Sequence, residues 1–336
     1  IVCRSLKALT LEMKHKIALF CDVSKDSVIT AMDVASIYDV PLILENEGLD
    51  QAVCKKLSLD VKTNELDTWK EYVRALHDPT SLELKVAIVG KYVHLSDCYL
   101  SVVEALYHAA TGQQCKVEII WIDSEELKED SYEKTLAEVA GVVVPGGFGE
   151  RGIEGKVLAA KFCREKNVPY LGLCLGMHIA SIEFARHVLN LKGATSEEFS
   201  KKAKDLIIGL LPDQKNVKKG GTMRLGSYTC KVKSGTLLHK SYQQTTIHER
   251  HRHRYEFNNT YKKAFEKAGM IFSGTSPDGN LMEVIELKNH RWFVACQFHP
   301  EFKSRPVTAH PLFSSFIQKV KEYSGVQQGL FEDPNS

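Results

Sequence analysis

Apolar and polar positions alternate along most of the chain in a pattern of strands and helices. Four runs are almost continuously apolar, as parallel strands buried on both faces are, at 84–92, 116–123, 141–149 and 168–173. The stretches that follow or separate them have the composition of helices, at 100–110, 156–166 and 175–189. This alternation predicts an α/β fold with a mostly parallel, doubly wound sheet.

The pattern changes on both sides of this region. Beyond about Gly220 the apolar runs are more typical of antiparallel strands, in SYTCKV, MEVIEL and RWFVACQF, and a closing helix is expected over 312–323. Before it, short apolar runs and helical stretches lead into a polar connector. We therefore expect a first α/β segment at 1–60, a linker at 61–83, the main domain at 84–326 and a polar tail at 327–336.

Composition and charge limit the classes of partner. The 336 residues are 43% hydrophobic and 26% charged, with a formal net charge of +2, which does not favour nucleic acid or an anionic membrane. No apolar run is long enough to span a bilayer. The nine cysteines lack C-x-x-C pairs, so we expect no disulfide framework, no zinc site and a reducing, cytoplasmic location. The chain starts without methionine or a secretory signal, and we expect it to be part of a longer protein.

The first candidate catalytic residue is Cys174. It stands between an expected strand and an expected helix, with Gly172 and Gly176 nearby. Two glycines so close indicate a sharp turn, and strand–turn–helix is the arrangement of a nucleophile elbow, here with sulfur. The positive end of the helix favours a thiolate, and its free amides can donate to an oxyanion. A buried structural cysteine is the alternative, and we prefer it for the other eight cysteines.

A thiol nucleophile requires a base, and His299 follows the apolar run FVACQF. At the carboxyl end of a strand, His299 would face the same crevice as Cys174, and Glu301 could accept from its second ring nitrogen. Gly146 and Gly147 end another strand, where their amides can approach a substrate closely. Each of these alone would be an ordinary turn. Together with Cys174 they predict a Cys–His–Glu triad with an oxyanion hole.

These segments resemble the class I glutamine amidotransferases, and within them the CTP synthase family. The resemblance rests on VPGGFGERGIEGK, VPYLGLCLGM, GGTMRLG, ERHRHRYEFN and FVACQFHPEF. In residues 1–60, the segments CRS, KIALFCDV and MDVASIYDVPLIL resemble the end of the synthetase domain of that family. The resemblance covers nearly the whole chain. It implies an amidotransferase fold preceded by the tail of a P-loop-like α/β synthetase domain.

The resemblance also implies a reaction. Glutamine would be hydrolysed through a thioester on Cys174, with His299 as general base and acid and Glu301 as its orienting partner. The ammonia would reach a synthetase domain that uses ATP and Mg²⁺ to phosphorylate UTP and aminates it to CTP. GTP would be the allosteric activator, with no cofactor in the amidotransferase domain, and the family assembles as homotetramers. Since most of the synthetase domain is absent, we expect this chain alone to be at most a glutaminase.

The same resemblance implies binding roles for further residues. The oxyanion hole would be formed by Gly147 and the amide of Leu175. The glutamine contacts would be Leu175, Gly176, Met177, His178, Glu198 and Arg254. A guanidinium such as that of Arg254 can bind the α-carboxylate in a bidentate fork, and Glu198 would pair with the substrate ammonium group. The segment 220–226 would be a mobile lid, with Arg224 near the GTP site. The positions for ATP and for UTP or CTP would be Arg4, Lys16, Asp33 and Val34.

Three details leave room for other interpretations. The family normally has glutamine where this chain has His178, which puts glutamine affinity and its pH dependence in question. In ERHRHRYE the alternation places His251 and His253 on one face, although we expect no metal there. Gly90-Lys91 lacks the upstream glycine of a P-loop and is interpreted as a strand end. The alternatives to an active amidotransferase are a non-catalytic or regulatory subunit and a γ-glutamyl hydrolase on the same fold.

Overall fold

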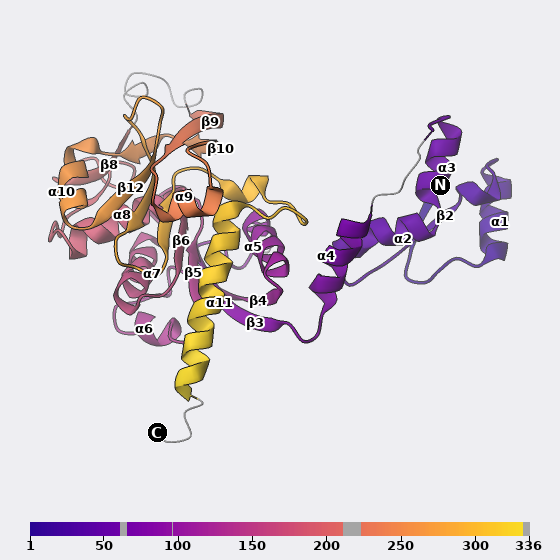
Figure 1. Ribbon diagram of the computed structural model, residues 1–336, viewed down its shortest axis with the longest axis horizontal. Coiled ribbons are helices and arrows are strands. Elements are labelled where there is room, and N and C mark those ends of the chain that lie inside the picture. Colours follow the sequence, from indigo (N-terminus) through magenta and orange to yellow (C-terminus); the bar gives the residue numbers. More distant parts are fainter. Residues whose placement is uncertain (61–65, 96, 211–222, 332–336) are drawn as a thin grey trace. The chain divides into compact units, whose positions relative to one another are not determined.

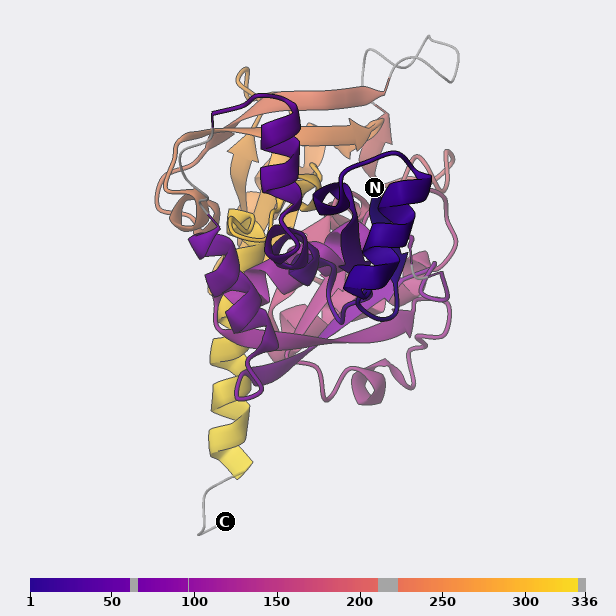
Figure 2. The ribbon, with the colours of Figure 1, turned by 90° about the vertical axis from the view of Figure 1, so that its right-hand side faces the viewer.

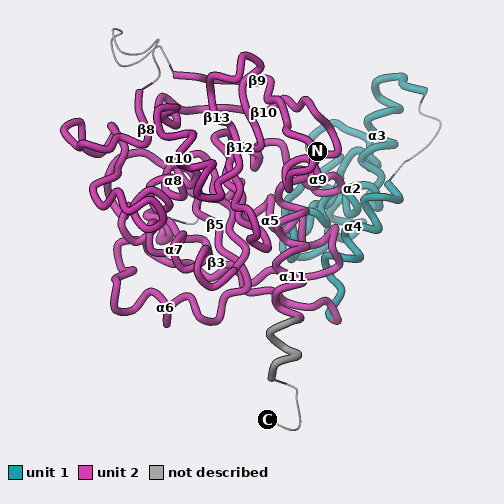
Figure 3. Tube along the Cα trace, turned by 60° about the vertical axis from the view of Figure 1, so that its left-hand side comes forward, with its two compact units in different colours: residues 1–79 teal, residues 80–336 magenta. Residues whose placement is uncertain are grey.

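The computed structural model describes residues 1–60, 66–95, 97–210 and 223–331. The chain forms two compact units, unit 1 (Ile1–Pro79) and unit 2 (Thr80–Ser336), which are coloured separately in Figure 3. The division falls inside the range 61–83 where the sequence predicts a linker.

Unit 1 is built on two short parallel strands, β1 (Val2–Ser5) and β2 (Ile29–Met32). Its α-helices are α1 (Leu11–Phe20), α2 (Val40–Asn46), α3 (Leu49–Lys56) and α4 (Asp67–His77). α4 lies in the segment expected to be a polar connector. Its apolar residues Trp69, Tyr72 and Val73 recur at helical spacing, and Tyr72 and Val73 are buried.

Unit 2 contains a nine-stranded sheet in the order β10-β9-β12-β13-β14-β6-β5-β3-β4. The strands are β3 (Leu82–Gly90), β4 (Cys115–Asp123), β5 (Gly141–Val144), β6 (Tyr170–Leu173), β9 (Arg224–Val232), β10 (Thr246–His253), β12 (Met270–Thr275), β13 (Met282–Leu287) and β14 (Phe293–Cys296). The pairings from β14 to β4 are parallel, and those from β10 to β14 are antiparallel. β14 therefore joins the parallel and antiparallel parts.

Helices cover both faces of this sheet. One core lies under α7 (Ile153–Lys166), α8 (Leu175–His187) and α10 (Lys262–Lys267). The other lies under α5 (Leu100–Gly112), α9 (Leu237–Tyr242) and α11 (Pro311–Phe331). Figure 1 shows α7 and α8 on one side of β5 and β6, and α5 and α11 on the other. Figure 2 shows the last turns of α11 extending beyond the strands.

Two smaller features complete the described part of unit 2. A three-stranded sheet is formed by β7 (Thr195–Ser196), β8 (Leu206–Leu210) and β11 (Tyr255–Phe257). A short helix, α6 (Tyr132–Thr135), precedes β5. Neither feature was predicted as a separate element, since each is only a few residues long.

The elements predicted between 84 and 189 are confirmed, with boundaries that differ by a few residues. Two predictions need correction. The closing helix is longer than predicted, since α11 runs from Pro311 to Phe331. β14 was grouped with antiparallel strands, yet it also pairs in parallel with β6, with Cys296 opposite Leu173. This parallel pairing brings the chain after β14 beside the chain after β6.

Candidate active site

Cys174 occupies a tight turn between β6 and α8, and its own backbone makes the turn. Its φ is 51° and its ψ is −97°, a conformation that a residue with a Cβ adopts only under strain. The Cys174 amide donates to the Cys296 carbonyl at 2.8 Å, and the Met177 amide donates to the Cys174 carbonyl at 3.0 Å. The turn is thus anchored to β14 on one side and to the first turn of α8 on the other.

The sequence predicts that Gly172 and Gly176 make the turn at Cys174, but the structure gives them another role. Neither Gly172 nor Gly176 has a positive φ, so neither makes the turn. A Cβ on Gly172 would lie 2.7 Å from the Gly176 carbonyl oxygen, and a Cβ on Gly176 would lie 2.2 Å from the Val144 carbonyl oxygen. These glycines let α8 pass close to the ends of β5 and β6 and so hold Cys174 at the edge of the sheet.

His299 follows β14 and directly precedes the 3₁₀ helix η5 (Pro300–Lys303), and Glu301 lies within that helix. His299 Nδ1 is 2.7 Å from Glu301 Oε1, and the two side chains are 12% and 6% exposed. Burial alone would lower the pKa of His299, but the neighbouring Cys174 sulfur and Glu301 carboxylate raise the pKa of this imidazole to about 10. An imidazolium is therefore favoured beside the sulfur at neutral pH.

The loop after β5 closes around this pair. A Cβ on Gly146 would lie 2.9 Å from His299 Cε1 and 3.6 Å from Cys174 Cβ, so only glycine fits between the loop and both side chains. Gly147 packs against Leu175, to whose Cδ2 a Cβ would come within 3.4 Å. The amide of Leu175 is the first of α8, where N–H groups lack partners within the helix. Gly147 therefore lies against the side chain of the residue that would supply the second oxyanion donor.

Lys91 supports the same loop, a role that the sequence did not indicate. It directly follows β3 and is 7% exposed, and its ammonium group donates to the Phe148 carbonyl. The carboxylate of Glu198 accepts from the Gly149 amide at 2.8 Å. A lysine after a strand is usually a surface charge, so only the fold shows that Lys91 reaches across to the glycine loop.

A cavity of about 380 Å³ opens in front of these groups. Its wall includes Gly146, Gly147, Cys174, His299 and Glu301, the two glycines and the three expected triad residues. Aromatic side chains of Tyr92, Tyr99, Phe148 and Phe302 form another part of the wall. The structure therefore brings one thiol, one imidazole and one carboxylate together at a hollow large enough for a small molecule.

The residues expected to hold glutamine fall into two groups. Burial raises the pKa of Glu198 above its ordinary value, although the Gly149 amide and the positive charges of Lys91 and Arg254 oppose the rise. The opposite charges of Glu198 and Arg254 suit an α-amino acid. The other group, Leu175 to His178, is buried in α8. None of the six expected glutamine contacts, Glu198 and Arg254 included, is part of the cavity wall.

His178 is committed to another partner inside the protein. It is 3% exposed, and its Nε2 lies 2.8 Å from Gln297 Oε1. Gln297 Nε2 in turn donates to Cys174 Sγ at 3.8 Å. Burial lowers the pKa of His178 to about 4, so the ring is neutral at physiological pH. Gln297 is the second site residue that the sequence did not indicate, because only the fold brings it behind the thiol.

β10 confirms the predicted alternation of histidine and arginine. His251 and His253 are buried and Arg250 and Arg252 are exposed. His251 Nδ1 lies 2.9 Å from His253 Nε2. Burial lowers the pKa of His251 to about 2 and that of His253 well below its ordinary value, so both rings are neutral.

Arg224 is not on an exposed lid. It begins β9, its side chain is 9% exposed, and its guanidinium lies 2.7 Å from Glu283 Oε1 and 3.3 Å from Glu256 Oε1. Two buried carboxylates already hold the guanidinium, so the structure does not present Arg224 to a nucleotide. Residues 220–222 of the expected lid lie outside the described residues.

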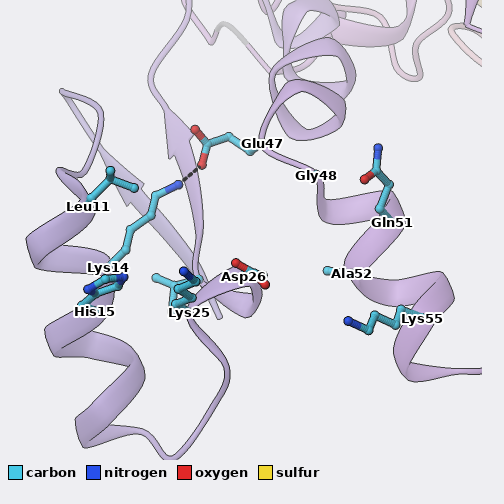
Figure 4. Close-up of a pocket in the computed structure, with 11 residues that line it drawn as sticks. Leu11, Lys14, His15, Lys25, Asp26, Glu47, Gly48, Gln51, Ala52 and Lys55 are labelled. Carbon is cyan, nitrogen blue, oxygen red and sulfur yellow. Dashed lines mark hydrogen bonds and ion pairs between the residues drawn. The ribbon is translucent and has the colours of Figure 1, made fainter.

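The residues expected to bind nucleotides lie in unit 1. Arg4 Nε donates to Asp33 Oδ1 at 2.8 Å, so the structure brings these two together, and both are exposed, as is Lys16. Val34 is half-buried near Asp33. A separate hollow of about 530 Å³ in unit 1 has Lys14, Lys25 and Lys55 in its wall, with Lys14 paired to Glu47 (Figure 4). None of Arg4, Lys16, Asp33 and Val34 is part of that wall.

The described residues give no indication of a metal cluster or a membrane span. Among these residues, no group of three or more histidine, cysteine, aspartate or glutamate side chains could hold a metal ion. Within the same residues, no helix has both the length and the apolar character needed to cross a membrane.

Comparison with known proteins identifies the family of this site. Residues 94–319, more than half of the chain, match the family model described as "Glutamine amidotransferase class-I". The chain belongs to the class I glutamine amidotransferases. In this amidotransferase, residues 1–59 match a second family model, "CTP synthase N-terminus".

Curated relatives of this amidotransferase are named CTP synthase. The chain is 54% identical to the protein of Carboxydothermus hydrogenoformans, 52% to that of Moorella thermoacetica and 50% to that of Bacillus subtilis, each over 318 residues. Each match covers 94% of this chain and 59% of the relative, so the chain spans about three fifths of their length. A solved glutaminase domain of Trypanosoma brucei CTPS with bound acivicin is 36% identical, with a TM-score of 0.68, and the match covers 71% of this chain and 94% of that one.

Proposed function

We propose that unit 2 hydrolyses glutamine to glutamate and ammonia, as the glutaminase half of a CTP synthase. The observation that carries this proposal is the strained backbone of Cys174 beside the His299–Glu301 pair. A residue with a Cβ is held at φ 51° only where the surrounding structure demands it, which is typical of a nucleophile elbow. The names of the curated relatives support CTP synthase over other members of the family.

The first half-reaction would form a thioester. Cys174 Sγ attacks the γ-carboxamide carbon of glutamine, and the amides of Gly147 and Leu175 stabilise the oxyanion that develops. His299 gives its Nε2 proton to the leaving nitrogen, because its Nδ1 is engaged by Glu301. The carbon–nitrogen bond breaks, ammonia leaves and glutamate remains bound to sulfur as a thioester.

The second half-reaction would return the enzyme to its starting state. Water attacks the thioester carbon and gives its proton to His299, which now acts as a general base. The carbon–sulfur bond breaks, glutamate leaves and Cys174 is again a thiolate beside an imidazolium. Glu301 stabilises that imidazolium in both halves of the cycle because its carboxylate remains hydrogen-bonded to Nδ1.

Binding of glutamine would use the opposite charges beside the loop. We propose that Arg254 binds the α-carboxylate and that Glu198, which already accepts from Gly149, binds the α-ammonium group. The burial of His178 and its hydrogen bond to Gln297 support a role inside the protein in place of the direct substrate contact predicted from the sequence.

The fate of the ammonia would depend on the longer protein. We propose that in a protein of the relatives' length it aminates UTP to CTP with ATP and Mg²⁺, under activation by GTP, in a cytoplasmic homotetramer. Arg4, Lys16, Asp33 and Val34 would contribute to the ATP and UTP or CTP sites, and the exposed guanidinium and ammonium groups suit phosphates.

The experiment is ammonia release from L-glutamine by the full chain, with labelling by 6-diazo-5-oxo-norleucine. We expect turnover that the label abolishes, with the label on the peptide that contains Cys174. Cys174→Ala should lose at least 1,000-fold in rate, roughly the range seen for loss of other nucleophiles. Cys163→Ala is the matched control, since Cys163 is also fully buried and lies in α7 outside the site.

A second substrate separates this proposal from the alternative hydrolase. Free glutamine should be hydrolysed in preference to γ-glutamyl peptides. Both carry the α-ammonium and α-carboxylate groups that Glu198 and Arg254 would bind, so the preference would come from the leaving group, which is ammonia for glutamine and a larger amine for the peptides, in a cavity of about 380 Å³. A folded chain that neither releases ammonia nor takes up the label would contradict the glutaminase proposal.

A further inference from the structure

A chain of buried hydrogen bonds runs from α8 to the catalytic sulfur. Gln297 lies between the end of β14 and His299 and is fully buried. Its backbone amide donates to the Glu283 carbonyl at 2.8 Å, which fixes its main chain to β13. Its side chain then spans the gap between His178, at 2.8 Å, and the Cys174 sulfur, at 3.8 Å.

The direction of these hydrogen bonds follows from the donors available. Gln297 Nε2 faces the sulfur and donates to it, so Gln297 Oε1 faces His178 and must accept. His178 Nε2 therefore carries a hydrogen and donates it. Since burial keeps the ring neutral, with a pKa of about 4, this tautomer does not depend on pH near neutrality.

We propose that His178 is a positioning residue, which orients the side-chain amide of Gln297 so that Gln297 donates a hydrogen bond to the Cys174 sulfur. This proposal rests on the proposed glutaminase function and adds a donor to it. Without His178 the Gln297 amide could rotate by half a turn and present its oxygen to the sulfur. An oxygen there would repel a thiolate, whereas an N–H group stabilises it.

The expected effect concerns the charged form of sulfur. Hydrogen bonds to ionised acceptors are stronger than those to neutral ones, so the Gln297 donor favours thiolate over thiol. The donor adds to the imidazolium of His299, and it also restrains the side chain of Cys174 before glutamine arrives. Attack on the substrate removes the charge from sulfur, so this hydrogen bond matters most in the free enzyme.

The other titratable groups near this chain of bonds are few among the described residues. His299 and Glu301 face Cys174 from the η5 side, and Cys296 faces it from β14. Arg252 of β10, whose carbonyl oxygen lies 4.0 Å from the sulfur, and Tyr99 share the cavity wall with Cys174. His253 faces His178 from β10, and burial holds that ring neutral. The His299–Glu301 pair is the same in the Gln297 and His178 variants as in the starting protein. A change in the pH profile therefore reports the loss of the Gln297 donor.

The test is the pH dependence of alkylation of Cys174 by iodoacetamide, measured on the full chain by mass spectrometry of the Cys174 peptide. In Gln297→Leu the midpoint of the profile should rise by about one pH unit, the value of one hydrogen bond to a charged group. His178→Phe should shift the midpoint in the same direction. The double variant should shift it no further than Gln297→Leu alone, because His178 acts through Gln297.

Two further variants separate positioning from packing. His178→Gln keeps a donor at this position and should restore a profile within a few tenths of a pH unit of the starting protein. His290→Phe is the matched control. His290 is less buried than His178, but its Nε2 likewise lies against an oxygen, the main-chain oxygen of Cys163, away from Cys174. His290→Phe should leave the profile unchanged. Thermal unfolding of each variant confirms folding, and His178→Leu replaces His178→Phe if the larger ring is not accommodated.

The outcomes are distinct. An unchanged midpoint in Gln297→Leu, or a double variant with the sum of the two single shifts, overturns the proposal. Failure of the chain to release ammonia or take up the glutamine analogue would instead count against the proposed function, because alkylation needs no glutamine turnover.

Discussion

The side chains around Cys174 come from distant parts of the sequence. His299 and Glu301 follow β14, and Gln297 lies just before them. Burial of these groups strengthens their mutual electrostatics, because the surrounding dielectric is low. The same burial makes each group sensitive to the removal of its partner.

Replacement of Glu301 by glutamine tests this dependence. Glu301→Gln keeps an acceptor for His299 Nδ1 but removes the charge that helps to raise the pKa of His299 to about 10. We expect ammonia release at pH 7 to fall at least 100-fold, by analogy with loss of the orienting carboxylate in other triads. The measurement is the rate of glutamine hydrolysis between pH 6 and pH 10.

The pH dependence of protein stability tests the same interaction between Glu301 and His299. A histidine whose pKa is raised on folding stabilises the protein fully below its unfolded pKa of about 6.5, and that contribution is lost as pH rises towards 10. Glu301→Gln should lose this contribution at a lower pH than the starting protein does. Identical losses of stability between pH 7 and pH 10 in the two proteins would contradict the assignment of Glu301.

The sequence was sufficient to name the thiol, the imidazole and the carboxylate, because each stands at the end of an apolar run. It was not sufficient for Lys91 and Gln297. A lysine after a strand and a glutamine near the end of another carry no local signal, and their partners lie 57 and 123 positions away. Arg224 shows the converse, since the glycines before it in the sequence predicted a lid, whereas its side chain belongs to a buried ion-pair network.

At the scale of elements, the site depends on how closely α8 approaches the strands. The first turn of α8 lies against the end of β5, with the Val144 carbonyl over Gly176. Tyr170 in β6 donates its hydroxyl to the Gly176 carbonyl at 2.9 Å, and its ring stacks on Phe293 of β14. The strand, the helix and the neighbouring strand thus hold the turn at Cys174 from three sides.

Gly176→Ala measures the importance of this close approach. Its new Cβ would lie 2.2 Å from the Val144 oxygen, so α8 must shift, and we expect a loss of about 3 kcal/mol in the free energy of unfolding. Gly112→Ala, in the last turn of α5 where a Cβ meets nothing within 4 Å, is the matched control and should gain about 0.5 kcal/mol. Urea unfolding of both variants checks this, and equal stabilities would refute the steric account.

Element type was more predictable than element partnership. Continuous apolar runs identified the parallel strands between 84 and 173 because burial on both faces leaves no polar positions. The dual pairing of β14 could not be read from its own residues, since FVAC suits either neighbour. α4 was missed for the opposite reason, because polar residues outnumber the few apolar ones that form its buried face.

At the scale of the molecule, the two units differ in the size of their cores. Among the described residues of unit 1, the buried hydrophobic side chains are only those of Ala18, Val28, Ile29, Tyr72 and Val73. Large apolar side chains such as Leu6, Leu19 and Phe20 are at least 80% exposed there. Unit 2 contains two extensive hydrophobic clusters, one on each face of its sheet. We expect unit 2 to be much the more stable of the two.

Hydrogen exchange followed by mass spectrometry tests this difference. Backbone amides of β1 and β2 should exchange at least about tenfold faster than those of β5 and β6, because opening unit 1 exposes little apolar surface. Both pairs are short parallel strands, so β5 and β6 serve as an internal reference within the same chain. Equal protection of the two pairs would show that unit 1 is stabilised by more than its own core.

The backbone conformation of Cys174 has an evolutionary consequence. Glycine adopts a positive φ without strain, whereas a residue with a side chain costs about 1–3 kcal/mol in such a conformation. Folding alone would therefore select glycine at this position, and on the proposed function it is the reaction that selects cysteine. In a lineage that no longer needed the proposed release of ammonia, this residue would be among the first to drift.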